Sequence, residues 1–530
     1  MIKNKKVFWA AAFLIGWGFD FFYWKKPLGI SFAIHILISV GMLIYLAQRE
    51  DKRPAAGSLW VLGALLVFSF LTFIRQEPFT RALNHLTSLG LFAILLLTFR
   101  GGHWFHYSLV DYVVGGFKLF FQALILPIKL LMDKKGKESE NDKDQKTGSG
   151  PSFWKRIFPY LRGIVLALPI LAVFTALFAA ADPIFADRLQ DLTEYLKLER
   201  LPEYIGRLVL IMIWTFLTGG LSLYAILKSK EESLIGEGDS WPPRFLGFTE
   251  AAIVLGSVNL LFFSFVFIQF RYFFGGESNI TLQGYTYAEY ARRGFGELLA
   301  AAFITLLLFM LLSSITNRES PREKKVFTGL TALLTVFIGV ILVSSFQRLR
   351  LYEIAYGFTR LRTYAHICIL WIGVLFLGIL ILEILHRWRH FTLAALITLI
   401  GFVITLNMIN VDSFIAQRNF TRHGEDTPLD IHYLKGLSND AVPQLIRLAD
   451  SPRLTTDQRR ELSASLACRA ALLRDRPSTW QGFIWSRYHA KLELSQNQSL
   501  WKDYLTYREN DVWYVLINGE REYCKPNIWD

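Results

Sequence analysis

Eleven stretches of mostly apolar residues recur along this 530-residue chain, and they constrain its fold more than any other feature. Each has roughly the 20-residue length that an α-helix needs to cross the hydrocarbon core of a bilayer. None carries a charge in its middle, which is typical of transmembrane helices. The stretches are residues 7–24, 28–47, 58–74, 82–99, 163–186, 208–227, 248–270, 294–316, 326–346, 363–382 and 391–410. The sequence therefore predicts a polytopic membrane protein.

The composition agrees with this prediction. Hydrophobic residues make up 53% of the chain and charged residues only 19%, against about 25% charged in an average soluble protein. This balance excludes a disordered, fibrous or ordinary cytosolic protein. The net charge of +13 favours contact with anionic lipid headgroups, because no nucleic-acid-binding motif accompanies it. We expect membrane lipids as partners and no nucleic acid.

The spaces between the apolar stretches suggest where the domains divide. Residues 112–132 are apolar but contain Lys118, Pro127 and Lys129, so we expect a helix that lies in the membrane interface rather than across it. The predicted domains are a first bundle with four spans and this interfacial helix (1–132), a charged cytoplasmic linker (133–160), a second bundle with seven spans (161–412) and an extracytoplasmic soluble domain (413–530).

The C-terminal domain carries two local signals. Thr455 with Gln458 three residues later forms a capping box that starts an amphipathic helix, and Asn518-Gly519 between two β-prone runs indicates a tight hairpin. The predicted fold is an all-α polytopic membrane protein with about 11 transmembrane helices and a small, mainly helical C-terminal soluble domain that ends in a β-hairpin.

The distribution of Lys and Arg predicts the orientation. With the N-terminus inside, the inner segments hold 26 of these residues and the outer loops hold 15. The positive-inside rule then places the N-terminus in the cytoplasm and, after an odd number of crossings, the C-terminal domain outside.

Arginines are unusually frequent in the two outer loops that flank spans seven to ten. Two readings remain open: these arginines pair with distant acids, or they bind an anionic headgroup, phosphate or carboxylate by forked hydrogen bonds. Arg293 is set apart, because Glu289 and Glu297 lie four residues away on either side and predict helical ion pairs. The ligand-binding candidates are Arg271, Arg292, Arg348, Arg350, Arg360 and Arg362.

Four acids lie in or near the apolar spans, where an ionisable group is a functional candidate because it is costly to bury. They are Asp20, Asp182, Glu250 and Glu297. Each lies within about one turn of a predicted helix end, so interfacial capping or ion pairing competes with a role in proton relay.

Catalytic and metal-binding motifs are scarce. We find no zinc-protease motif, phosphate-binding loop or nucleophile elbow, so the sequence disfavours an enzyme and predicts no cofactor. His386 and His390 have metal-ligand spacing, but Arg387 and Arg389 would oppose a cation. Neither this pair nor His103 with His106 predicts a metal site.

The chain has three cysteines. Cys368 falls inside a predicted span, where it would serve packing. Cys468 and Cys524 both lie in the domain that the charge distribution places outside, where a disulfide could form; two free buried thiols are the alternative.

Six tracts together resemble a family of polytopic bacterial membrane proteins that is classified only as a domain of unknown function. The tracts are AADPIFADR, FLGFTEAAIVLG, QFRYFFGG, YTYAEYARRGF, YGFTRLR and DIHYLKGLSNDAVPQL. The resemblance runs from the first spans into the C-terminal domain, with YARRGF as its signature. It implies a bacterial cytoplasmic-membrane location and a shared polytopic architecture, and it supplies no activity, cofactor or catalytic residue.

Three functional hypotheses follow. The first is a non-enzymatic protein that binds an anionic lipid, envelope component or partner at its outer face, in a sensing or assembly role. The second is a transporter or flippase whose intramembrane acids or arginines line a path. The third is a membrane-embedded transferase acting on lipid-linked substrates, which would need Asp20, Asp182 or Glu250 beside a histidine in one cavity.

Overall fold

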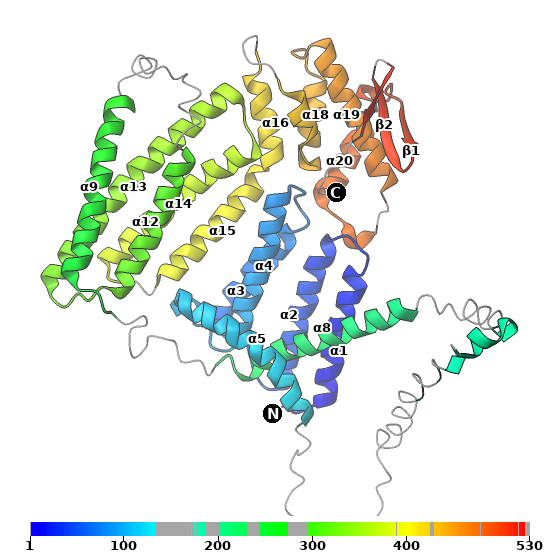
Figure 1. Cartoon of the computed structure of the whole chain (residues 1–530), viewed down its shortest axis with the longest axis horizontal. Coiled ribbons are helices and arrows are strands. Elements are labelled where there is room, and N and C mark those ends of the chain that lie inside the picture. Colours follow the sequence, from blue (N-terminus) through cyan, green and yellow to red (C-terminus); the bar gives the residue numbers. More distant parts are fainter. Residues whose placement is uncertain are drawn as a thin grey trace, which may run out of the picture. The chain divides into compact units, whose positions relative to one another are not determined.

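A computed structural model of the chain shows a helical membrane protein with a small sheet near its C-terminus (Figure 1). The structure describes residues 2–132, 201–230, 244–273, 295–387, 390–424, 429–476, 479–517 and 519–524, and scattered residues between 167 and 188. Contacts divide the chain into a larger unit of Met1–Lys3, Phe22–Phe121 and Leu221–Asp530 and a smaller unit of Asn4–Phe21 and Gln122–Gly220.

Apart from residues 163–186, the predicted spans form helices, and the apolar residues 112–132 form one as well. They are α1 (Lys5–Tyr23), α2 (Ile30–Arg49), α3 (Ala56–Leu71), α4 (Pro78–Thr98), α5 (Leu109–Met132), α8 (Leu201–Leu227), α9 (Phe248–Phe273), α12 (Phe295–Ile315), α13 (Pro321–Tyr356), α14 (Arg360–Ile384) and α15 (Phe391–Ile409). Among the described residues, nine of these helices are long and apolar enough to cross a membrane, and α3 is a shorter apolar helix. Only scattered residues of the predicted span 163–186 are described, and the predicted linker 133–160 lies wholly outside the described residues.

Helix α5 is continuous through Pro127 and belongs to the nine by length and composition. The interfacial placement, which was expected from Lys118, Pro127 and Lys129 and not from length, stays a prediction.

In the smaller unit, α1 and α8 pack through small residues. A Cβ on Gly16 would lie 2.3 Å from the hydroxyl of Thr215, so only glycine allows this approach. Phe19 stacks on Trp214 with ring centroids 3.9 Å apart. These contacts place Asp20 of α1 beside Arg207 of α8.

In the larger unit, helices pack in sequence along α2, α3, α4, α15, α14 and α13, and α13 also contacts α9 and α12. Asn84 of α4 and Asn407 of α15 exchange side-chain hydrogen bonds of 3.0 and 2.9 Å. Both amides are buried, so the pair fixes the alignment of two apolar helices.

Helix α13 has 36 residues, or about 54 Å at 1.5 Å per residue. It begins with a capping box at Ser320 and Glu323, next to a buried ion pair between Arg318 and Glu383 at 2.8 Å. The second outer loop, expected between the predicted spans 326–346 and 363–382, is much shorter than expected: α13 continues to Tyr356, because no glycine or proline occurs between Phe346 and Gly357, and α14 begins at Arg360.

The C-terminal part consists of α16 (Val411–Arg422) and a compact domain. Its elements are α17 (Ile431–Lys435), η4 (Asn439–Ala441), α18 (Val442–Ala449), α19 (Thr456–Asp475), η5 (Trp480–Gly482), α20 (Trp485–Gln496), η6 (Gln498–Leu500), β1 (Thr506–Glu509), β2 (Val512–Ile517) and β3 (Glu520–Tyr523); η1 (Trp104–His106) precedes α5. The predicted capping box at Thr455 and the hairpin between β2 and β3 are confirmed. The additional strand β1 follows from Asn510 and Asp511, which both have positive φ and turn the chain tightly into β2.

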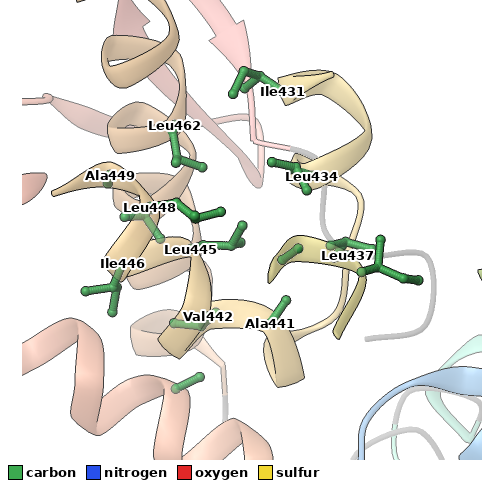
Figure 2. Close-up of a cluster of buried hydrophobic side chains, with 14 of the residues drawn as sticks. Ile431, Leu434, Leu437, Ala441, Val442, Leu445, Ile446, Leu448, Ala449 and Leu462 are labelled. Atoms are coloured by element: carbon green, nitrogen blue, oxygen red, sulfur yellow. The ribbon is translucent and has the colours of Figure 1, made fainter. Parts of the chain in front are cut away.

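The core of this domain is continuous with the membrane helices. Leu434, Leu437, Val442 and Leu445 pack in one buried cluster (Figure 2). Leu406 of α15 belongs to the same cluster. The C-terminal domain, which was expected to begin at residue 413, therefore shares its hydrophobic core with the end of α15.

Replacing Asn84 with alanine should remove one partner of the Asn407 amide and destabilise the protein by about 1–3 kcal/mol, the cost of an unsatisfied buried polar group. The double variant Asn84→Leu/Asn407→Leu should cost less than the sum of the two single leucine variants, because it leaves no amide unpaired. Thermal unfolding in detergent measures both effects. Strictly additive losses would contradict this role.

Candidate functional site: an arginine turn beside a docked domain

The turn between α13 and α14 depends on Gly357. Its φ is +81°, and a Cβ there would lie 2.9 Å from Oδ1 of Asn419, so glycine is required. Asn419 of α16 holds the next residue, accepting from the backbone N–H of Phe358 at 2.6 Å and donating to its carbonyl at 2.9 Å. Helix α16 therefore clamps this turn.

Two guanidinium groups converge on the same turn. Arg362 donates to the carbonyl of Gly357 and stacks on Tyr352, with its Cζ 3.9 Å from the ring centroid. Arg422 donates to the carbonyl of Ile354 at 2.7 Å. Carbonyls at a helix C-terminus attract cations, which explains why α13 ends between two arginines.

The two charges are close enough to affect each other. Burial, and secondarily the charge of Arg362, lowers the pKa of the Arg422 guanidinium. Arg350 and Arg418 add exposed positive charge on α13 and α16. We call Arg362 and Arg422, with the turn whose carbonyls they contact, the arginine turn.

Exposed apolar side chains lie along the same turn. Ile354 and Tyr356 are 54% and 53% exposed, and Leu361 is 80% exposed. Guanidinium groups beside exposed aliphatic and aromatic side chains suit an anionic group at a membrane surface.

The other predicted arginines have structural partners or lie outside the described side chains. Arg348 is buried and donates to Oε1 of Gln269 at 2.9 Å. Arg360 forms an ion pair with Asp412. The side chain of Arg271 and all of Arg292 lie outside what the structure describes. Of the six candidates, the structure brings Arg362 to the turn and leaves Arg350 exposed on α13.

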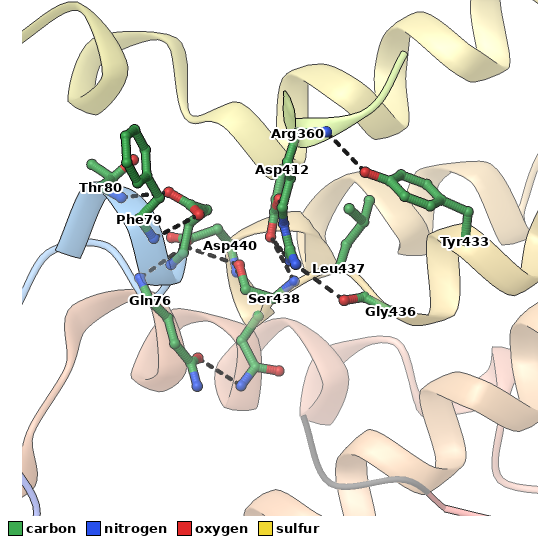
Figure 3. Close-up of polar contacts among 12 residues, drawn as sticks. Gln76, Phe79, Thr80, Arg360, Asp412, Tyr433, Gly436, Leu437, Ser438 and Asp440 are labelled. Atoms are coloured by element: carbon green, nitrogen blue, oxygen red, sulfur yellow. Dashed lines mark hydrogen bonds and ion pairs between the residues drawn. The ribbon is translucent and has the colours of Figure 1, made fainter. Parts of the chain in front are cut away.

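A buried polar network, which we call the docking network, holds the C-terminal domain to α4, α14 and α16 (Figure 3). Asp412 is fully buried; it receives two hydrogen bonds from Arg360, at 2.7 and 2.6 Å, and one from the backbone N–H of Ser438 at 2.6 Å. The backbone N–H of Arg360 also donates a hydrogen bond of 2.9 Å to the hydroxyl oxygen of Tyr433.

Asp440 forms the second half of the docking network. Its Oδ2 accepts the backbone N–H groups of Gln76 and Glu77 at 2.8 and 2.7 Å. The side chain of Glu77 caps α4 and also accepts from the hydroxyl of Tyr364. Burial, and then the charge of Asp412, raises the pKa of the Asp440 carboxyl, while Arg75 and the two backbone donors oppose that rise.

Three of the four predicted acids have local contacts in the described part of the chain. Asp20 is 3% exposed and receives two hydrogen bonds from Arg207 at 3.0 and 2.6 Å. Asp182 accepts the N–H of Ile184 at 2.9 Å and Glu250 accepts that of Gly247 at 2.6 Å; both are exposed, as is Glu297 in the first turn of α12. These contacts are ion pairing and helix capping.

The histidines and cysteines complete the candidates. His106 and His390 have ring centroids 5.9 Å apart, yet no group of three His, Cys, Asp or Glu side chains in the described part of the chain could hold a metal ion.

Cys468 and Cys524 are joined as a disulfide with Cα atoms 5.3 Å apart, which ties α19 to the end of β3. Cys368 is a free, partly buried thiol in α14.

Sequence reasoning missed Gln76, Glu77, Asp412 and Asp440. A weak signal exists for Glu77, which precedes Pro78 at the first position of a helix, where an acid side chain caps well. Nothing local marks the others, because Asp440 meets Gln76 from 364 positions away along the chain.

Replacing Asp412 with alanine should leave Arg360 without its buried carboxylate and cost about 3–5 kcal/mol. The loss should appear first as faster amide hydrogen exchange in residues 431–524, because the C-terminal domain loses its attachment. Asp457→Ala, which removes an exposed acid from the same domain, is the matched control. Unchanged exchange in the Asp412 variant would contradict the network.

The raised pKa of Asp440 predicts a pH dependence. The pKa of Asp440 in the folded protein lies above its ordinary value of about 3.9. The stability that the protonated carboxyl contributes is therefore fully present below pH ~3.9 and is lost as the pH rises through the folded-state pKa. Between these two pKa values the free energy of unfolding of the wild-type protein should fall by up to ~1.4 kcal/mol per pH unit. The free energy of unfolding of Asp440→Asn should fall less, because the asparagine side chain stays neutral. Thermal unfolding from pH 4.5 upward tests this, and parallel profiles would contradict it.

Comparison with known proteins gives one match. No curated protein and no solved structure matches the chain. A family model described as a domain of unknown function, DUF4153, matches residues 62–448, which cover both the arginine turn and the docking network. The chain therefore belongs to the DUF4153 family.

Proposed function

We propose that this protein is a non-enzymatic component of a bacterial cytoplasmic membrane that binds an anionic lipid or a phosphate-bearing envelope component at its arginine turn. The observation that carries the proposal is the convergence of Arg362 and Arg422 on Gly357, where backbone carbonyls fix both guanidinium groups. Guanidinium groups whose position is fixed before binding lose little entropy when they bind a phosphate.

The neighbouring domain suggests a role in sensing or assembly. Arg360 of the docking network and Arg362 of the arginine turn are two residues apart in the first turn of α14, and α16 supplies both Asp412 and Arg422. An anion at the arginine turn would therefore act on the two helices that hold the C-terminal domain.

Transport is a second candidate, supported by polar groups buried between apolar helices. Arg348 contacts Gln269 between α13 and α9, and His366 of α14 lies 3.1 Å from the Glu353 carboxylate. The acids considered for a path from sequence, Asp20 and Glu250, have ion-pairing and capping roles instead. Lipid scrambling in proteoliposomes that depends on Arg348 would favour transport over binding.

The binding proposal predicts that phosphatidylglycerol, added to the detergent-purified protein, raises its thermal unfolding midpoint and that phosphatidylcholine does not. Arg362→Gln/Arg422→Gln should lower the affinity obtained from a lipid titration of this midpoint at least tenfold, roughly the loss of one charge-assisted hydrogen bond of ~1.5 kcal/mol. Arg350→Gln/Arg418→Gln should weaken it as well without touching the carbonyl contacts of the turn.

The control is Arg447→Gln/Arg453→Gln, which removes the same charge from exposed positions of the C-terminal domain. Inorganic phosphate tested in parallel separates a soluble phosphate ligand from a lipid headgroup. An equal response in the arginine-turn and control variants would overturn the proposal.

We also propose that the N-terminus is cytoplasmic and the C-terminal domain extracytoplasmic. The excess of Lys and Arg in the inner segments supports this orientation, as does the Cys468–Cys524 disulfide, since disulfides persist in oxidising compartments. A C-terminal alkaline phosphatase fusion should be active and a green fluorescent protein fusion dark. A fluorescent C-terminus with two freely labelled cysteines would reverse the orientation.

A further inference from the structure

Helix α20 has two different faces. One face packs on α18 and α19, and its buried residues are Ser486, Ala490 and Leu494. The other face is exposed and apolar; its residues are Trp485, Tyr488 and Leu492, which are 49%, 52% and 42% exposed. Their spacing of three and four residues places them on one stripe of the helix, and Lys491 is exposed beside it.

The stripe begins at the end of an apolar helix. The backbone N–H groups of Trp485 and Ser486 donate to the carbonyls of Phe73 and Ile74, at 2.7 and 3.2 Å, directly after α3. Phe70, in the last turn of α3, is 56% exposed and contacts the ring of Phe73. An exposed phenylalanine on an apolar helix faces lipid, so α20 starts at the edge of the lipid-facing surface.

A second attachment joins the same part of the domain to the turn between α1 and α2. The N–H of Ile30 donates to the carbonyl of Phe483 at 3.0 Å. A Cβ on Gly29 would lie 2.5 Å from the backbone of Gly482, so the two backbones touch. Trp480, which is 51% exposed, has its ring 6.0 Å from that of Phe22.

The α1–α2 turn itself has an interfacial composition. It carries Trp24, Lys25 and Lys26, and Leu28 is 46% exposed. Tryptophan is enriched at both membrane interfaces, and lysine extends its ammonium group to the headgroups from such positions. The aromatic residues of the C-terminal domain therefore continue a surface that already lies at this depth.

We propose that the C-terminal domain is partly embedded in the bilayer interface, with Trp480, Trp485, Tyr488 and Leu492 at the boundary between headgroups and acyl chains. The occupant of this surface is the lipid bilayer, because the stripe is continuous with lipid-facing helix ends and is bordered by lysines that complement anionic headgroups. The inference is independent of the ligand at the arginine turn.

The test uses the full-length protein in nanodiscs of phosphatidylcholine and phosphatidylglycerol, with Cys368→Ser as the background. A nitroxide is attached at Tyr488→Cys or Leu492→Cys, and Asp457→Cys, at an 87% exposed side chain of α19, is the matched control. At positions 488 and 492, collisions with oxygen should exceed those with a water-soluble nickel reagent by several-fold more than at position 457. The Cys368→Ser parent should give no signal, and a thermal unfolding midpoint of each labelled protein equal to that of the parent shows that the labelled protein is folded.

Two outcomes would overturn the proposal. Equal accessibility to the nickel reagent at positions 488, 492 and 457 would place the stripe in water. Dipolar broadening between two labels at position 488, lost on dilution with unlabelled protein, would assign the stripe to contact with a second copy of the chain.

Discussion

The position of the C-terminal domain depends on one buried carboxylate, that of Asp412. A charge so far from water is tolerated only when its lone pairs are satisfied, and here Arg360 and the backbone of Ser438 supply the donors. These donors come from a membrane helix and from the domain. Asp412 therefore fixes two parts of the protein that apolar packing alone could hold in several registers.

The sequence could reveal features that depend on neighbouring residues, and it could not reveal polar contacts between distant segments. Helices over the apolar stretches and the hairpin at Gly519 were predictable, because hydrophobic length and turn chemistry are local properties. The end of α13 was not, because Gly357 stops the helix against Asn419 of a distant helix. The docking network was equally hidden, since Asp440 and Gln76 become neighbours only through the fold.

The same distinction applies to the candidate site: local sequence suggested where arginines gather, but not which partners they have. Arginine-rich tracts marked residues on both sides of the α13–α14 turn as candidates, but they could not show which side chains were engaged elsewhere. Arg360 and Arg362 are two residues apart, and one faces a carboxylate while the other faces helix carbonyls. Arg422, from α16, completes the pair at the turn without any local motif. Only the three-dimensional contacts separate structural arginines from those that can meet a ligand.

The length of α13 has a mechanical consequence. A helix of 36 residues that begins at the Ser320 cap and ends at Gly357 connects the Arg318–Glu383 ion pair to the α13–α14 turn in one uninterrupted element. At about 54 Å long, it converts a rotation of about 10° at one end into a displacement of about 9 Å at the other. Small adjustments near Arg318 and Glu383 would thus be amplified on the opposite face of the bilayer, and the long helix would act as a lever arm across the membrane.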